Sequence, residues 1–151
     1  MREFYKAVQL LKDTLESDPF VNTIKHGLRS TTDVEKQNIF PLAHLQVVNS
    51  SVQQGYVSFT FEVACVDVRM VSNKPTTDKF LSNDNELDNL NTTFAVLNRL
   101  ITILRNLNND DAIELGNDPT PLPIIFEDTN LLDGWRCEIE LLVPNTEISV
   151  C

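Results

Sequence analysis

The chain has 151 residues, of which 42% are hydrophobic and 23% are charged. This length is sufficient to bury the core of one domain, and the composition is typical of globular proteins and excludes intrinsic disorder. Twelve basic and 22 acidic residues give a formal net charge of −10. That charge argues against tight binding to nucleic acid or to an anionic membrane, because both require a positive electrostatic potential on the protein.

The net charge lies entirely in the second half of the chain. Residues 1–81 carry nine acids and nine bases, whereas residues 82–151 carry thirteen acids and three bases. A well-solvated surface that keeps the protein soluble explains this asymmetry. The alternative interpretation is that one face of an assembly is acidic.

Neither the N-terminal residues nor the cysteines indicate an extracytoplasmic protein. The sequence begins without the apolar segment of a signal peptide, and no apolar run approaches the roughly 18 residues of a membrane span. Cys65, Cys137 and Cys151 are too far apart for a disulfide framework or a metal site. Cys65 and Cys137 lie in strand-like runs, so we expect small buried hydrophobes in a reducing compartment.

The first half of the chain predicts a helix followed by three strands. A helix is expected over 2–16, because its apolar residues share one face, and the proline after Asp18 ends it. The residues of that face are Phe4, Val8, Leu11 and Leu15. A short strand over 20–25 and an exposed loop over 29–38 follow.

Two alternating runs, over 42–52 and 56–71, predict a long β-hairpin with its turn at Gly55. In the second run the apolar positions change phase after Cys65. A strand cannot change face without an extra residue, so this phase change predicts a β-bulge or a sharp bend near residues 64–66. A hairpin of this length would project from a small domain, and we expect its far end to contact another subunit.

After a loop over 72–82, the chain predicts a long amphipathic helix ending near Leu107. Asn83 would cap this helix, with Glu86 as the reciprocal member of a capping box. The apolar positions repeat at spacings of three and four, which favours packing across a sheet over a coiled coil. They are Leu87, Leu90, Phe94, Leu97, Ile101 and Leu104.

The remaining residues predict short strands over 112–115 and 124–126, a half-buried strand over 135–143 and a loosely held tail over 146–151. The order of elements predicts one α+β domain over 1–151. It would contain one mostly antiparallel or mixed sheet with a long hairpin, packed by an N-terminal helix and one long amphipathic helix.

No catalytic, cofactor-binding or metal-ligating residue is identified, and we expect neither a cofactor nor an enzyme. The two histidines lack partners at metal spacing, and His44 is interpreted as a surface or interface residue. Nucleophile-elbow and phosphate-binding glycine motifs are absent. The acids around Asp110 lack the pattern of an EF-hand calcium loop. Glu138 and Glu140 share one strand face and are interpreted as keeping it soluble.

The predicted order of elements resembles the tail-terminator and tail-completion proteins of long-tailed bacteriophages. Three stretches carry the resemblance: Ile-Phe-Pro-Leu-Ala-His at 39–44, Leu-Asn-Thr-Thr-Phe-Ala-Val-Leu-Asn-Arg-Leu at 90–100, and Leu-Asp-Gly-Trp-Arg-Cys-Glu-Ile-Glu-Leu at 132–141. The resemblance implies a structural virion protein of the tail or neck, made in the cytoplasm of a bacterial host. It also implies a ring, expected to be hexameric, that caps the tail tube and joins it to the head.

The implied partners are further copies of the chain, the tail tube protein, the neck and connector proteins and, where the tail contracts, the sheath. DNA would pass through the ring without specific binding. We predict the subunit interface on the hairpin, at Leu45, Val47, Tyr56, Phe59, Phe61, Val66, Val68 and Met70. The loops 29–38 and 72–82 would face axial neighbours. We predict an acidic lumen or solvent face at Asp110, Asp111, Glu114, Asp118, Glu138 and Glu140.

A second function class fits the same charge. A small acidic binding protein, such as a chaperone, an inhibitor or a nucleic-acid mimic, would use an acidic face to occupy a basic partner. Such a protein needs no ring, so the oligomeric state separates the two hypotheses.

Overall fold

The computed structural model of the chain describes residues 2–27, 39–71, 77, 79–81, 84–108, 111–127 and 131–145. Within them the elements are α1 (Glu3–Glu16), β1 (Thr23–His26), β2 (Leu42–Gln53), β3 (Tyr56–Val68), α2 (Glu86–Arg105), β4 (Glu114–Leu115), β5 (Leu122–Glu127) and β6 (Leu132–Pro144). The predicted 29–38 loop and 146–151 tail, and most of the 72–82 loop, lie outside the described residues.

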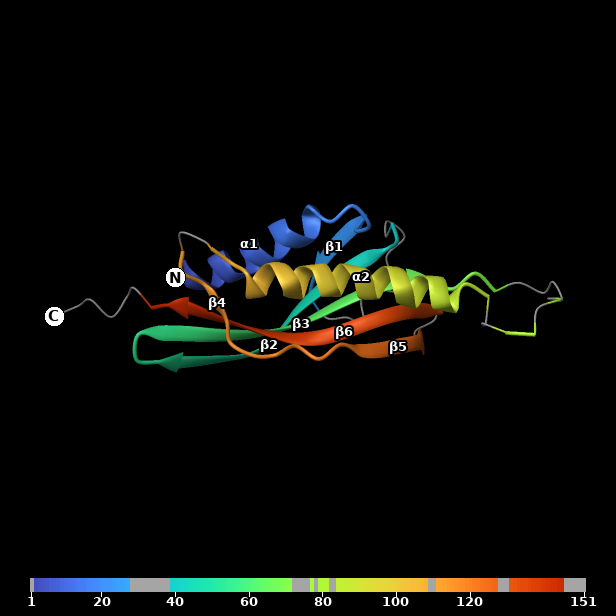
Figure 1. The fold of residues 1–151 in the computed structure, drawn as a ribbon. Helices are drawn as coiled ribbons and strands as arrows, with labels where there is room; N and C mark the ends of the chain where they lie inside the picture. Colours follow the sequence, from blue (N-terminus) through green and yellow to red (C-terminus); the bar gives the residue numbers. More distant parts are fainter. Residues whose placement is uncertain are drawn as a thin grey trace.

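The predicted α+β fold is confirmed. The strands form one mixed sheet in the order β1-β2-β3-β6-β4, with β5 also paired to β6. β1 runs parallel to β2, and every other pair is antiparallel. Both helices lie on one face of this sheet, and the β2–β3 hairpin projects beyond them at one end (Figure 1). The molecule therefore has one helix-covered face and one open face.

The main core lies between the helices and the sheet. The inward side chains of β3 and β6 alternate with outward ones, as strand geometry requires. Phe61 and Ile139, which are paired across these strands, are fully buried in this core. Phe4 of α1 meets the ring of Phe59 edge-on, with centroids 5.4 Å apart. This contact anchors the first turn of α1 on the hairpin.

The buried face of α2 is rotated relative to the predicted stripe. Leu97 and Leu104 are buried as expected, but Leu87 and Phe94 are 48% and 42% exposed. Asn89 and Thr93 are buried near the start of the helix; the Thr93 hydroxyl donates to the Asn89 carbonyl, and the Asn89 amide donates to Val68 of β3. Because their polar groups are satisfied, these residues can be buried in positions that hydropathy assigns to solvent.

The predicted capping box is wrong. The helix begins at Glu86, Asn85 makes no side-chain capping bond, and Asn83 lies outside the described residues. The Asn85 side chain instead accepts a hydrogen bond from the Met70 amide, and Glu86 accepts one from Arg69. Both polar side chains are used to join α2 to the end of β3.

The predicted bulge near 64–66 is also wrong. β3 pairs with β6 without any register shift, and the irregularity lies in β2, between Val47 and Asn49. Val66 faces away from the helices and is buried in a second, smaller apolar cluster on the open face. The buried members of that cluster are Leu42, Ala64, Val66, Ile124 and Leu132. The phase change in the sequence therefore marks a strand that is buried on both faces.

The structure confirms the prediction for two cysteines and corrects that for His44. Cys65 and Cys137 are buried, and burial raises the pKa of each thiol to about 12. His44 is only 2% exposed, so it is not a surface residue. It lies on the same face of β2 as Leu42, at the end of the sheet where both faces are covered.

Most of the predicted interface side chains belong to the chain's own interior. Leu45, Phe59, Phe61 and Val66 are at most 6% exposed, so they offer no surface to a neighbour. Val47, Tyr56 and Val68 are half-buried, and Met70 is 73% exposed. Alternating strand residues were assigned to an interface because hydropathy does not distinguish a core from a subunit contact. The exposed end of the hairpin, beyond Val47 on β2, remains the part that a neighbour could reach.

Candidate functional site

The open face of the sheet carries a row of glutamates. On β3 and β6 the residues next to the core side chains point to the opposite face. Glu62 is paired in register with Glu138, and Thr60 with Glu140. The three glutamates therefore project from the middle of the sheet, on the side that neither helix covers (Figure 1). We call Glu62, Glu138, Glu140 and the neighbouring Glu114 the glutamate row.

Negative charge within the glutamate row is only partly neutralised. Glu62 and Glu138 are direct cross-strand neighbours, an arrangement in which like charges repel. Arg136 lies one step along β6 on the same face, and its Nη1 is 3.3 Å from Glu62 Oε2. Its side chain is 42% exposed, so solvent weakens this pair. The cross-strand pair therefore places two like charges side by side on the open face.

Glu114 extends the row to the edge of the sheet. It is paired with Leu142, which belongs to the open face, so its side chain points the same way. Next to it, the Asn117 side chain donates to the Glu138 carbonyl and accepts from the Glu140 amide, both at 2.9 Å. The Asn117 side chain thus makes the two hydrogen bonds that a peptide group of a neighbouring strand would make with the edge of β6, next to the glutamates.

The structure thus places three of the six predicted acids in the glutamate row and a fourth, Asp118, beside the row in a cavity at the sheet edge. Asp111 lies beside α1, where it accepts a bond of 2.6 Å from Lys6 Nζ. Asp118 lies 3.2 Å from Arg105 and is 96% exposed. Asp110 lies outside the described residues. Glu62 is not among the six predicted acids, although its place between Phe61 and Val63 on an alternating strand is the signal that identifies it as an outward residue.

A shallow cavity of about 320 Å³ adjoins the glutamate row at the sheet edge. Its lining residues come from β3, from β6 and from the segment that joins β4 to β5. They are Glu62, Asn117, Asp118, Thr120, Leu122, Arg136, Cys137 and Glu138. Carboxylates dominate the charge of this lining, so a cationic group is the ligand chemistry that it favours.

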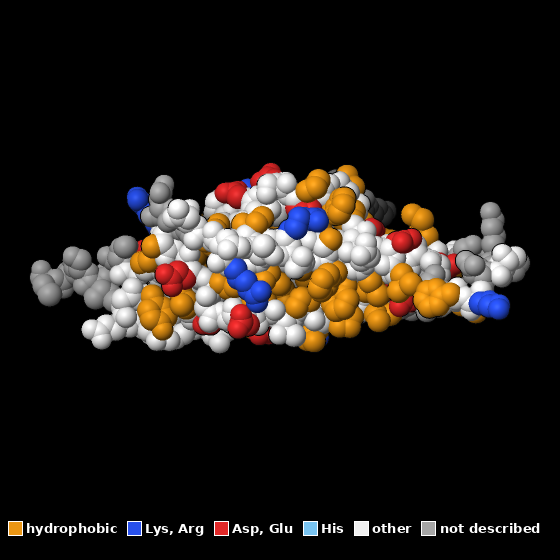
Figure 2. Space-filling model, viewed as in Figure 1, with side chains coloured by type: hydrophobic (Ala, Val, Ile, Leu, Met, Phe, Trp, Pro, Cys, Tyr) orange, Lys and Arg blue, Asp and Glu red, His pale blue; other side chains and the backbone are white. Residues whose placement is uncertain are grey.

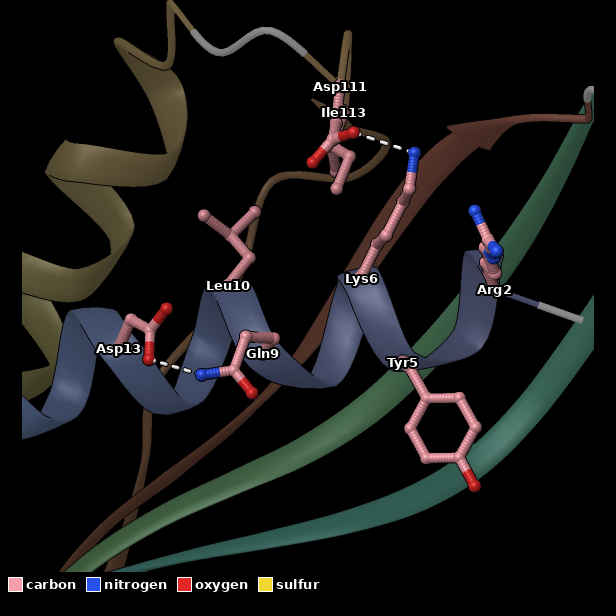
Figure 3. Close-up of a pocket in the computed structure, with 8 residues that line it drawn as sticks. All are labelled: Arg2, Tyr5, Lys6, Gln9, Leu10, Asp13, Asp111 and Ile113. Atoms are coloured by element: carbon pink, nitrogen blue, oxygen red, sulfur yellow. Dashed lines mark hydrogen bonds and ion pairs between the residues drawn. The ribbon is translucent and has the colours of Figure 1, made fainter.

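A second groove, of about 440 Å³, runs along the outer side of α1. Figure 3 shows that Lys6 reaches across it to Asp111, while Gln9 bonds Asp13 along the helix. Tyr5 points away from this pair and is 73% exposed. The ion pair closes the groove between α1 and the segment before β4, so its evident role is to hold these two elements together.

The Asp133-Gly134-Trp135 stretch lies within β6 and contacts neighbouring elements. The sequence alone indicates a turn followed by a core or interface aromatic residue. Asp133 is fully buried and accepts two hydrogen bonds from Arg69, at 2.7 and 2.8 Å. A side chain at Gly134 would overlap the Cys65 carbonyl of β3. Trp135 Nε1 donates to the Leu90 carbonyl of α2. Each residue therefore fixes β6 against a different neighbour, and the stretch has an evident structural role.

Hydrogen bonding to Asp133 raises the pKa of the Arg69 guanidinium, so Arg69 stays positively charged. Glu86 adds a third charge, 2.8 Å from Arg69 Nη2. This network was missed because its members are 64 and 17 residues apart in the sequence.

Within the described residues there is no group of three or more His, Cys, Asp or Glu side chains placed to hold a metal ion. Neither described helix is long and apolar enough to cross a membrane. No protein-family model matches the chain, and no curated protein matches its sequence. The open face with its glutamate row is accordingly the feature from which a function can be argued.

Proposed function

We propose that the protein is a structural virion component similar to a phage tail terminator. In this proposal copies of the chain form a ring, with hexameric symmetry as the resemblance implies, that caps the tail tube and joins it to the neck. The open face of the sheet lines the channel. The protein acts by assembly and has no catalytic step.

The observation that supports this proposal is the glutamate row. An open sheet face in water needs polar side chains, but it does not need charges of one sign facing one another across strands. Glu62 and Glu138 do face one another in this way, which costs stability. A cost of this kind is understandable where a surface must repel phosphate.

A channel lined by carboxylates suits the passage of DNA. Six copies with a net charge of −10 carry about −60 in total, which repels the phosphate backbone and prevents DNA from adhering. The helices and their mixed charges would then face outward. Asp13 and Lys6 on α1 and Arg105 on α2 are examples of these mixed charges.

The first test is native mass spectrometry of the purified protein, supported by negative-stain images. The proposal predicts a ring with an open centre at high protein concentration or on the end of a tail tube. A chain that stays monomeric both alone and with the tube would contradict it. That result would favour the acidic binding protein, and a pull-down for a basic partner would follow.

The second test separates the glutamate row from general surface charge. Virions with Glu138→Gln and Glu140→Gln are compared with virions carrying Asp13→Asn and Glu16→Gln on α1, which remove the same charge from the helix side. Both variants should assemble, but only the first should slow DNA ejection. Equal ejection from the two would exclude a channel lined by the open face.

A further inference from the structure

The outer edge of β2 is open along the projecting half of the hairpin. β1 pairs with β2 only over Leu42–Leu45, and no other described strand pairs with that edge from Gln46 to Gln53. Val48 and Val52 in this segment are 50% and 73% exposed. The main-chain groups along such an edge are ready to pair with another strand.

This edge lacks most of the usual protection. Exposed edges in natural proteins commonly carry charged residues such as Lys, or Pro residues, and both hinder pairing with a second chain. β2 has none of these over twelve residues, in a chain that is 23% charged. The bulge between Val47 and Asn49 is its only irregularity. Pairing through an uncharged edge also keeps like charges out of the contact between two copies that each have a net charge of −10.

The register shows which amides point outward from the edge. Gln53 and Tyr56 flank the two-residue turn, so they form the hydrogen-bonded pair that closes the hairpin. Hydrogen-bonded and non-hydrogen-bonded pairs alternate along an antiparallel ladder. Val52 and Ser50 therefore direct their N–H and C=O groups away from β3, toward the open side.

The opposite edge of the sheet has a complementary stretch. Residues 119–126 also lack charge, and they lead into and form β5. Pro121 and Pro123 lack an N–H but keep their carbonyls, so this edge is a poor partner for a copy of itself but can still accept hydrogen bonds from an edge that supplies donors, such as β2. Leu122 and Ile125 are each 52% exposed, and hydrophobic side chains gather on the β5 side of the molecule, below α2 (Figure 2).

We infer that the β2 edge of one copy, Gln46–Gln53, pairs with the 119–125 edge of the next copy. The inference rests on the ring proposed above and names the two surfaces that close it. A ring needs two different surfaces on opposite sides of each subunit, and these edges fulfil that condition. Joining the sheets edge to edge also keeps the glutamate row of every copy on the same side.

The first experiment removes the outward donors. Ser50→Pro with Val52→Pro deletes two amides that β3 does not use, whereas Ser50→Ala with Val52→Ala keeps both amides. Loss of two hydrogen bonds at each contact should weaken association by about tenfold or more. Native mass spectrometry should therefore show rings for the wild type and the alanine variant only. Circular dichroism and the urea midpoint confirm that the proline variant is folded.

The second experiment identifies the partner edge. Val52→Cys and Leu122→Cys are combined in a Cys151→Ser chain, in which the remaining thiols are the buried Cys65 and Cys137. The two introduced thiols lie on opposite edges of one sheet, so a short bismaleimide can join them only between copies. Pairing of β2 with the next copy's β5 edge predicts a ladder of covalent multimers up to the full ring.

The outcomes separate this inference from the proposed function. Rings that survive the proline changes, or rings without a ladder, overturn the edge pairing and leave the ring in place. Efficient dimers from Val52→Cys alone show that β2 pairs with β2 about a two-fold axis, which also overturns it. Both proposals are contradicted if the wild-type chain forms no rings and the variant with both introduced cysteines forms no cross-links.

Discussion

The two faces of the same strands differ in character in the middle of the sheet. On β3 and β6, the side chains under the helices are apolar and buried, with Phe61 and Ile139 at their centre. One residue further along each strand, the open face carries Glu62, Glu138 and Glu140. The helix-covered face explains why the chain folds. The open face contains charge that folding does not require, and for this reason we assign function to it.

The largest difference in the free energy of unfolding is expected between substitutions at two consecutive residues, Phe61 and Glu62. Phe61→Ala should reduce the free energy of unfolding by about 4 kcal/mol, because it leaves a cavity in a fully buried site. Glu62→Gln should change it by no more than about 0.5 kcal/mol, because the lost pair with Arg136 is offset by relief of repulsion from Glu138. Urea denaturation measures both. Comparable losses would show that the open face is part of the folding core.

The strand alternation and the α1 face could be predicted from the sequence because they depend on neighbouring residues. The α1 boundaries and the β2–β3 hairpin were therefore recovered closely. The burial of Val66 could not be predicted, because it depends on packing against Ile124 and Leu132, which are distant in the sequence. The burial of His44 could not be predicted either, because strand alternation does not show that both faces are buried at this end of the sheet. Of the glutamate row, strand alternation predicts an outward position for Glu138, Glu140 and also Glu62. The β3–β6 register is needed only to show that Glu62 lies directly opposite Glu138.

The buried ion pair should rank next in effect. Asp133→Asn removes one of the two carboxylates that pair with Arg69 and leaves Glu86 to balance the buried guanidinium, at a cost of about 3 kcal/mol. The double variant with Arg69→Met should recover part of that loss, which a double-mutant cycle by urea denaturation detects. Strict additivity of the two losses would show that these side chains do not interact.

Asp18, which lies on the helix-covered side of the sheet, should make the free energy of unfolding depend on pH. Burial raises the pKa of its carboxyl, but hydrogen bonds from Arg99 and from the Phe20 amide outweigh burial and lower the pKa below 3.8. The stabilisation is therefore present above the unfolded pKa and is lost as the pH falls through the folded value. Asp18→Asn should cost about 1–2 kcal/mol near neutral pH, because Arg99 is partly exposed, and much less near pH 2. Thermal melts across that range measure the difference, and a constant difference would contradict the pairing.

The smallest effect is expected from the glutamate row itself. Glu138→Gln removes a like-charge neighbour of Glu62 and should raise the free energy of unfolding by a few tenths of a kcal/mol, about 0.3. The gain should shrink at high salt, because exposed charges are screened. A loss of stability on urea denaturation would mean that Glu138 makes a favourable contact, and the argument that the row is kept for function would lose its basis.

The central claim is that copies of the chain form a ring whose channel is lined by the open face. A cryo-electron microscopy reconstruction of the assembled protein, alone or on a tail tube, tests it most directly. We predict an open-centred ring with Glu62, Glu138 and Glu140 facing the channel and with α1 and α2 on the outside. A ring with the helices toward the channel, or an assembly without a channel, would contradict the claim.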